Sequence, residues 1–137
     1  MKWMSPAGLL LCVAWVGTAT AQACGLPEKA IMMRAQDAAP FVVGLTIPRG
    51  AASVSMPFAL AITVCPTGNQ VADRVTADAS MPAHKHGMNY APEVVSKRAG
   101  VFEATGFLFH MPGLWRISVS VYNDGGTHHF THDVEVK

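Results

Sequence analysis

The segment 115–136 constrains the fold of this chain most strongly, because it holds two alternating stretches on either side of a turn signal. In the stretch 115–122, apolar residues alternate with polar or charged ones, and successive side chains of a strand point to opposite faces. An Asn-Asp-Gly-Gly sequence at 123–126 follows, and such residues are typical of tight β-hairpin turns. Residues 128–136 alternate again, so the segment predicts an antiparallel hairpin with one buried face.

The remainder of the chain repeats this character in short apolar runs that end at turns rich in Pro and Gly. The segment 25–36 fits either a short helix or an irregular first strand, and 70–79 fits an edge strand. About seven short strands predict an all-β fold, an antiparallel immunoglobulin-like β-sandwich, with a small barrel as the alternative. The other expected strands are 41–47, 57–65, 93–97 and 101–109, the last with a bend at Gly106.

The N-terminal segment 1–23 has the features of a secretory signal peptide. Lys2 supplies a positive start, an apolar run covers 7–17, and Ala-Gln-Ala at 21–23 supplies small residues at the cleavage positions. We therefore expect cleavage after Ala23 or nearby, one β-sandwich domain at 24–137, and a periplasmic or secreted protein. The alternatives are an uncleaved N-terminal anchor and a lipoprotein attached through the next residue, Cys24.

Charge and hydropathy exclude two classes of partner. The whole chain has 10 Lys and Arg against 9 Asp and Glu, and loss of the signal peptide removes Lys2. The exported chain is therefore close to neutral and has no basic patch for nucleic acid. It also has no second apolar stretch long enough for a transmembrane helix, so we expect no membrane span in the mature chain.

The exported chain keeps two of the three cysteines, because Cys12 lies within the signal peptide. In an oxidising compartment such a pair predicts a disulfide between Cys24 and Cys65. The bridge would close a loop of about 40 residues, and the chain-entropy model predicts that this stabilises the folded state by about 4 kcal/mol. The alternative is one lipidated cysteine and one free thiol.

The segment 81–88, Met-Pro-Ala-His-Lys-His-Gly-Met, concentrates the side chains that can do chemistry. Residues two apart in an extended chain share a face and lie roughly 7 Å apart, and Gly87 allows the bend that would bring two imidazoles to one ion. Imidazole and thioether together favour copper, Cu(I) in particular. The alternative is an exposed loop in which a methionine packs into the core. The candidate ligands here are Met81, His84, His86 and Met88.

A second pair of the same residue types, His110 and Met111, lies in a turn before the alternating strand. If both turns lie at one end of the sandwich, these residues complete the metal site. The alternative places Met111 in the core beside Trp115 and leaves His110 exposed. A blue-copper centre needs a cysteine thiolate, and Cys65 has no histidine nearby. Zinc usually draws on Cys, His and carboxylate ligands rather than Met.

These residues resemble the YtkA-like (FixH-related) domain family over about 40–137. The resemblance rests on the Met/His/Gly segment at 81–88 and on Met-Pro-Gly-x-Trp at 111–115. It implies an exported or membrane-tethered immunoglobulin-like sandwich, and some relatives are associated with copper handling or cytochrome oxidase assembly. This chain departs from the pattern in its two cysteines and in having no predicted anchor after the signal peptide. The matching positions are Met81, His84, His86, Met88, Met111 and Trp115.

The sequence thus predicts an exported, non-enzymatic copper-binding or copper-handling domain, whose partner is a copper-donor or copper-acceptor protein. It contains neither a Ser-nucleophile motif nor a Gly-rich phosphate loop. One alternative is a structural or protein-interaction module without metal, in which the methionines and Tyr90 make apolar contacts. A small redox enzyme with a single copper is the third interpretation.

Overall fold

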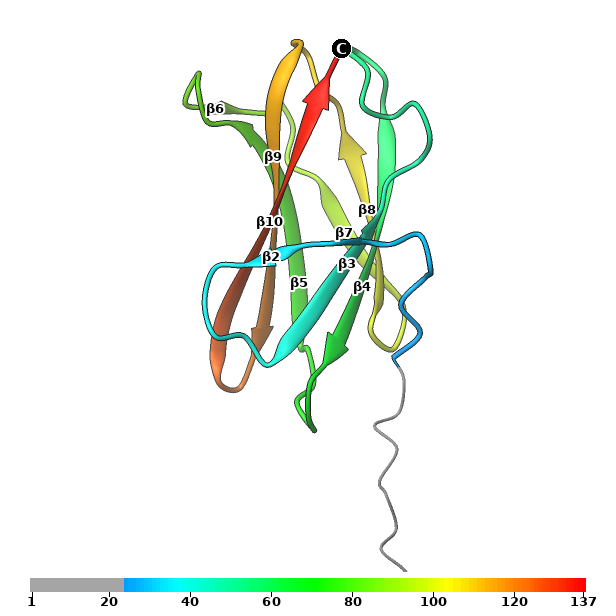
Figure 1. Ribbon diagram of the computed structural model, residues 1–137, viewed down its shortest axis with the longest axis vertical. Coiled ribbons are helices and arrows are strands. Elements are labelled where there is room, and N and C mark those ends of the chain that lie inside the picture. The colour runs from blue at the N-terminus through cyan, green and yellow to red at the C-terminus, as the bar shows by residue number, and fades with distance from the viewer. Residues whose placement is uncertain (1–23) are drawn as a thin grey trace, which may run out of the picture.

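The computed structural model describes residues 24–137, which form two five-stranded antiparallel sheets packed face to face (Figure 1). The predicted signal peptide, 1–23, lies outside the described residues. No helix forms between 24 and 137, and accordingly that part of the chain contains no helix long and apolar enough to cross a membrane. The prediction of an all-β antiparallel sandwich is therefore confirmed.

The first sheet has the strand order β1-β3-β4-β8-β7, and all its pairs are antiparallel. Its strands are β1 (Ile31–Met32), β3 (Phe41–Thr46), β4 (Phe58–Pro66), β7 (Glu93–Arg98) and β8 (Val101–Phe107).

The second sheet has the order β2-β10-β9-β5-β6, again with antiparallel pairs only. Its strands are β2 (Arg34–Ala35), β5 (Arg74–Met81), β6 (His86–Gly87), β9 (Gly113–Asn123) and β10 (Gly126–Val136).

The longer strands give the four-plus-three arrangement of an immunoglobulin constant-type domain. Seven strands have six or more residues, which agrees with the expected number. In chain order, the first, second, fifth and fourth of them lie side by side in one sheet, and the third, sixth and seventh form the other. That is the strand order ABED and CFG of the constant-type sandwich.

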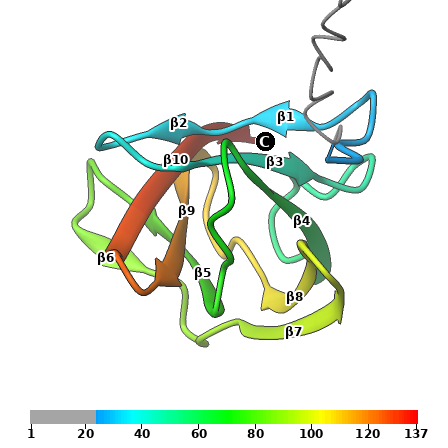
Figure 2. The ribbon, with the colours of Figure 1, turned by 90° about the horizontal axis from the view of Figure 1, so that it is seen from below.

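Pairing with distant strands decides the secondary structure of the segments for which the sequence allowed more than one prediction. The segment 25–36 contains two short strands, of which β1 pairs with β3 and β2 with β10, so it crosses from one sheet to the other (Figure 2). The expected edge strand at 70–79 is β5, which pairs with β9 on one side and with the two-residue β6 on the other. Strand β8 runs through Gly106, whose φ is 90°, and ends at Phe107.

The core lies between the sheets and is made by the inward residues of alternating strands. On β9, Trp115, Ile117, Val119 and Val121 are each 0% exposed, as their alternation with polar residues predicts. Leu60 and its neighbours on β4 face them from the other sheet. Each such aliphatic side chain contributes about 1.5–3 kcal/mol by leaving water, so β9 anchors both the core and the turn that precedes it.

A disulfide joins Cys24 to Cys65, as the cysteine pair predicts, with Cα atoms 5.4 Å apart. It ties the start of the described chain to the end of β4, at the lower end of the sandwich in Figure 1. Strand β6 lies at the opposite, upper end. The disulfide and the Met/His turn at 81–88 are thus at opposite ends of the molecule.

Replacing both cysteines by serine should lower the free energy of unfolding by about 2–4 kcal/mol, because the bridge closes a long loop with a sequence separation of 41. Urea unfolding of residues 24–137 measures the loss. Adding reductant to the wild type should produce a similar change and should leave the double variant unaffected. Equal unfolding midpoints for wild type and Cys24→Ser/Cys65→Ser would show that the bridge contributes nothing.

Candidate functional site

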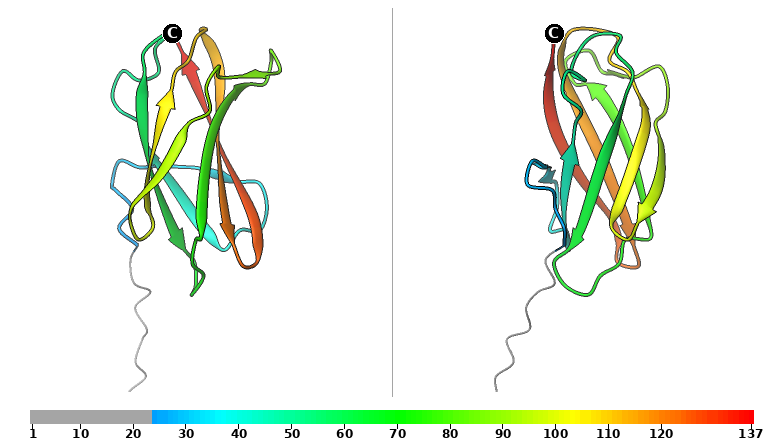
Figure 3. Two further views of the ribbon diagram at one scale, coloured as in Figure 1. Left: turned by 180° about the vertical axis from the view of Figure 1, so that it is seen from behind. Right: turned by 90° about the vertical axis from the view of Figure 1, so that its right-hand side faces the viewer.

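Pairing of β5 with β9 brings together the two Met/His turns, which are the turn at 81–88 and the turn that contains His110 and Met111. The strands are antiparallel and register Ser80 opposite Arg116, so the end of β5 and the start of β9 lie side by side. The chain leaves β5 at Met81 into the first turn and enters β9 at Gly113 from the second. Both turns therefore lie at one end of the sandwich, the upper end in Figure 3.

The first turn is a tight hairpin between β5 and β6. Met81 pairs with His86, and the carbonyl of Met81 accepts hydrogen bonds from the amides of His84 and Lys85 at 3.1 and 2.9 Å. Lys85 has a φ of 55°, the left-handed conformation that reverses the chain. His84 therefore lies in the turn and His86 on a strand, instead of both lying along one extended segment.

Imidazoles from both turns gather at this end. The ring centroids of His84 and His86 are 5.7 Å apart, and those of His86 and His110 are 5.2 Å apart with planes inclined by 29°. Two nitrogens bound to one metal lie within about 4 Å of each other, given bonds of about 2 Å. In the observed orientation the imidazoles of His86 and His110 are stacked, so a shared metal would require rotation of a ring about χ2, which meets only a broad, low barrier.

The hydrogen bonding of His86 leaves one ring nitrogen available. Its Nδ1 lies 3.1 Å from the carbonyl oxygen of Gly87. A carbonyl only accepts, so in the neutral ring Nδ1 carries the proton and Nε2 keeps its lone pair. The same arrangement, with the second nitrogen bonded to a carbonyl, orients most metal-binding histidines.

His110 has a buried nitrogen without a partner. Among the side chains of residues 24–137, two buried nitrogen atoms lack a hydrogen bond, namely Nδ1 of His110 and Nε2 of His128. An unsatisfied buried polar atom costs about 1–3 kcal/mol. A ligand that bound Nδ1 of His110 would remove that cost. The sequence interpretation in which His110 is simply exposed does not describe this ring.

The indole of Trp115 lies against both of these imidazoles. Its centroid is 5.2 Å from that of His110 and 6.0 Å from that of His86, with planes inclined by 81° and 69°. Its Nε1 donates a hydrogen bond to the carbonyl of Met111 at 3.0 Å. The first residue of the buried face of β9 thus holds the second turn in place.

The three methionines of the two turns pack inward to different degrees. Met81 is the last residue of β5 and only 2% exposed, so it belongs to the core, as the alternative interpretation expected. Met88 and Met111 are partly buried and pack against that core. A Cβ placed on Gly113 would be 3.0 Å from Cε of Met81, so Met81 extends to the start of β9 beside the second turn.

The candidate ligands of the two turns are imidazole and thioether groups. Across residues 24–137, no three or more His, Cys, Asp or Glu side chains form a group that could hold a metal ion. Methionine is not among those residue types, and the turns supply Met88 and Met111 beside the histidines. A metal site here would therefore combine thioether with imidazole ligands.

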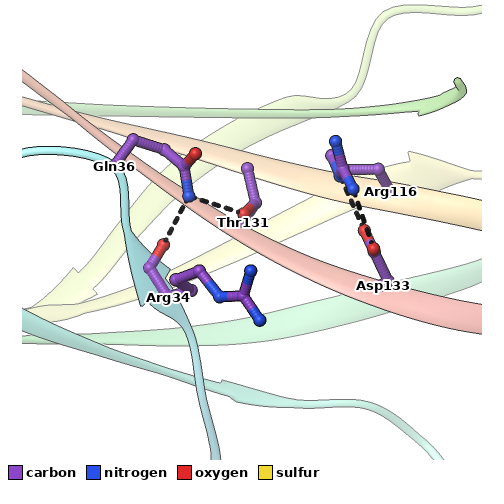
Figure 4. A network of polar contacts seen from close by, with 5 residues as sticks. All are labelled: Arg34, Gln36, Arg116, Thr131 and Asp133. Carbon is purple, nitrogen blue, oxygen red and sulfur yellow. Dashed lines mark hydrogen bonds and ion pairs between the residues drawn. The ribbon is translucent and has the colours of Figure 1, made fainter.

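A second polar cluster, drawn in Figure 4, lies on the outer face of the second sheet. Arg116 donates two hydrogen bonds to the carboxylate of Asp133, at 2.7 and 2.8 Å, and Gln36 donates one to Thr131 at 2.9 Å. The hydrogen bond from Arg116 lowers the pKa of Asp133, and the same bond raises the pKa of Arg116. Both side chains of the ion pair are exposed, so this cluster supports strand pairing modestly.

Ligand types alone did not indicate Trp115 and Gly113 as parts of this site. The sequence indicated Trp115 only through the family resemblance and through its place on a buried strand face. Neither of these predicts contact with two imidazoles. The available signal was its position two residues after a Pro-Gly turn that contains His110 and Met111.

Replacing Gly113 by alanine should lower the free energy of unfolding by about 1–3 kcal/mol, because its φ of 122° strains any residue with a Cβ. The new Cβ would also press on Met81 at 3.0 Å. Gly68→Ala is the matched control, since nothing lies within 4 Å of a Cβ there. Urea unfolding compares the variants, and equal stability of Gly113→Ala and Gly68→Ala would contradict this account of the turn.

Comparison of this chain with protein-family models, with curated proteins and with solved structures found no match. The resemblance to the YtkA-like domain therefore stays a prediction. The fold alone does not specify a function either, because one sandwich supports many activities. A functional conclusion for this chain has to come from the geometry of the two turns.

Proposed function

We propose that this protein is an exported, non-enzymatic copper-binding domain of YtkA-like type, which holds Cu(I) between its two Met/His turns. One observation carries the proposal: His86 and His110, from separate turns, stack at 5.2 Å. The hydrogen bond of His86 frees its Nε2, and Nδ1 of His110 is buried without a partner. The two rings that carry these nitrogens therefore lie next to each other, one from each turn.

The surrounding residues supply the other donors. The ring centroids of His84 and His86 are 5.7 Å apart, and Met88 and Met111 would add thioether sulfur from the same two turns. Met81 is the most buried candidate and would act mainly as packing beneath the site. Soft thioether with imidazole favours Cu(I), whereas zinc usually uses thiolate or carboxylate ligands.

The position of the site suits transfer of the metal to another protein. His84 is exposed at the tip of the hairpin, so a partner can reach a metal bound there. Leu114 is 45% exposed directly after Gly113, and Met56 is 53% exposed. The loop that carries Met56 joins this end through the amide of Ser55, which donates to the carbonyl of Phe109 at 2.7 Å. We propose a copper-donor or copper-acceptor protein as the partner.

Export is consistent with the covalent chemistry of the chain. A disulfide such as Cys24–Cys65 persists in oxidising compartments and is rare where thiols are kept reduced. A periplasmic or secreted location, reached through the predicted signal peptide, would give both the bridge and access to exported copper.

Replacing His84 and His86 by alanine should weaken Cu(I) binding by more than about a hundredfold, because loss of even an outer partner of a ligand costs roughly 10–100-fold. Competition with a colorimetric Cu(I) chelator measures the affinity, and titration calorimetry gives that for Cu(II). His110→Ala should reduce Cu(I) affinity by a similar factor.

The matched control is His129→Ala/His132→Ala, which removes two histidines of β10 outside the cluster and should leave the affinity unchanged. Wild-type affinity in the His84/His86 variant would place the metal elsewhere. Failure of the wild type to compete for Cu(I) at all would refute the copper proposal.

A second candidate function, a protein-interaction module without metal, is favoured by exposed apolar residues at the same end. Besides Leu114 and Met56, Tyr90 is 70% exposed in the connection that follows β6, and Val54 is 36% exposed. The amide of Val54 bonds to the carbonyl of Lys137 at 3.3 Å, which places that loop near the end of β10. Clustered exposed apolar groups often mark interaction surfaces.

Affinity capture from a periplasmic extract, with and without a strong copper chelator, separates the two functions. Copper handling predicts that the chelator releases the captured partner, because the shared metal joins the two proteins. A metal-free module predicts capture that survives the chelator and disappears in Leu114→Ser/Met56→Ser. Mass spectrometry identifies the bound protein in each case, and Val71→Ser, an exposed apolar residue in the β4–β5 connection, is the control.

A further inference from the structure

We propose that this chain forms a symmetric dimer in which β7 pairs antiparallel with β7 of a second copy. The contact joins the first sheets of the two copies into one continuous sheet. The dimer is independent of the proposed copper function, because β7 (Glu93–Arg98) contains none of the candidate metal ligands.

Strand β7 has a long edge without a strand partner. It has six residues, pairs with β8 on one side, and lies at the end of the strand order of the first sheet. The other edge strands between residues 24 and 137, which are β1, β2 and β6, have two residues each. An edge strand presents unpaired N–H and C=O groups, which are a template for the addition of another strand.

The edge of β7 is open to solvent. Figure 2 shows β7 along the outer border of the sandwich, with no coloured ribbon beyond it. Val95 is 40% exposed, and its neighbour Ser96 is exposed as well, although successive residues of a strand point to opposite faces. A second strand can therefore approach this edge without displacing a described part of the chain.

The two faces of β7 differ, and the outward face carries both charges. Val94 packs against the core, so it points inward. Glu103 of β8 lies between the buried residues Phe102 and Ala104, so it points outward. Lys97 reaches Glu103 at 3.3 Å and therefore shares the outward face. The outward residues of β7 are thus Glu93, Val95 and Lys97.

The two faces restrict the register of a symmetric pair. Directly opposite residues of a continuous sheet point to the same face, so outward residues must meet outward residues. The central register that satisfies this rule places Val95 opposite the partner's Val95. Glu93 then lies opposite the partner's Lys97 and, by the two-fold symmetry, Lys97 opposite the partner's Glu93. An apolar pair at the axis is flanked by two pairs of opposite charge, and both kinds of pair stabilise antiparallel strands.

The neighbouring registers that match the faces are less favourable. Centring the pair on Val94 places Val95 opposite the partner's Glu93, and centring it on Ser96 places Val95 opposite the partner's Lys97. Each of these registers sets an apolar side chain against a charge and loses both pairs of opposite charge. The sequence of β7 is therefore self-complementary in one register.

Other features of β7 are compatible with a contact that ends at two copies. The register between β7 and β8 shifts between Ser96 and Arg98, and such bulges discourage unlimited growth of a sheet. A two-fold contact also uses the edge of β7 in both copies, so a third copy finds no edge there. The Lys97–Glu103 ion pair is exposed, so Lys97 can interact with a further carboxylate at little cost.

The contact is small, because it involves one short strand from each copy. Interfaces below about 1,200 Å² belong mostly to weak complexes, and we expect a reversible dimer with a Kd of about 0.1–1 mM. Sedimentation equilibrium of residues 24–137 over a range of concentrations measures this affinity. A strong copper chelator in the buffer removes any contact that a metal would mediate.

Glu93→Lys and Lys97→Glu should each raise the Kd of the dimer at least about tenfold, because each turns both pairs of opposite charge into pairs of like charge. An equimolar mixture of the two variants should recover the wild-type affinity, since each variant then meets opposite charges on the other. Glu28→Lys makes the same change in net charge at an exposed residue before β1 and should leave the Kd unchanged.

Cysteine substitutions test the register. Directly opposite residues of antiparallel strands have Cα atoms about 4.5 or 5.5 Å apart, which suits a disulfide. Val95→Cys should therefore form a covalent dimer under mild oxidation, as a non-reducing gel would show. Glu93→Cys and Lys97→Cys should form one only when they are mixed with each other. The native cysteines do not interfere, because they are bonded to each other.

Three results would overturn the dimer. One is a wild type that remains monomeric at about 1 mM, the upper limit of the expected Kd. Another is a pair of charge variants that dimerise like the wild type, or that stay monomeric when mixed. The third is Val95→Cys that cross-links no faster than Glu93→Cys alone. All of these results leave the proposed Cu(I) site untouched, because the variants keep every candidate ligand.

Discussion

The antiparallel pairing of β5 with β9 is the constraint on which the rest of the site depends. Its register places Ser80 opposite Arg116, and from that single fact the first turn leaves the sheet where the second enters it. A slip of one residue would turn the buried face of β9 toward solvent, and it would take Trp115 away from both imidazoles. Burial of four successive inward residues of β9 makes such a slip very costly.

Much of the fold was predictable from sequence, because strand periodicity is local. The alternation at 115–121 assigned the buried face of β9 correctly, and the two cysteines outside the predicted signal peptide implied their bridge. The segment 25–36 was not predictable, since its two strands exist only through pairing with β3 and β10. Met81 illustrates the same limit within the site, because its chain position suggested a loop ligand and the length of β5 makes it core.

The candidate site combines well-anchored and unsatisfied groups. Trp115 and Met111 are joined by a hydrogen bond, and the hairpin turn is closed by two amides on one carbonyl. Nδ1 of His110, held between these anchored parts, has no partner. The contacts among His86, His110 and Trp115 depend on how two turns meet in space, which no local pattern encodes. Sequence therefore indicated the ligand types but not which of them come together.

Under the copper proposal, the disulfide matters for the order in which the chain is oxidised and binds metal. Reduced Cys24 and Cys65 would offer two thiolates, which are softer copper ligands than any thioether. The bridge removes both from competition and lies at the other end of the sandwich. Under the copper proposal, a chain oxidised before it meets copper presents only the site between the two turns, whereas a chain that meets copper first also presents a competing pair of thiolates. Formation of the disulfide before metal binding would then protect the proposed site from that competition.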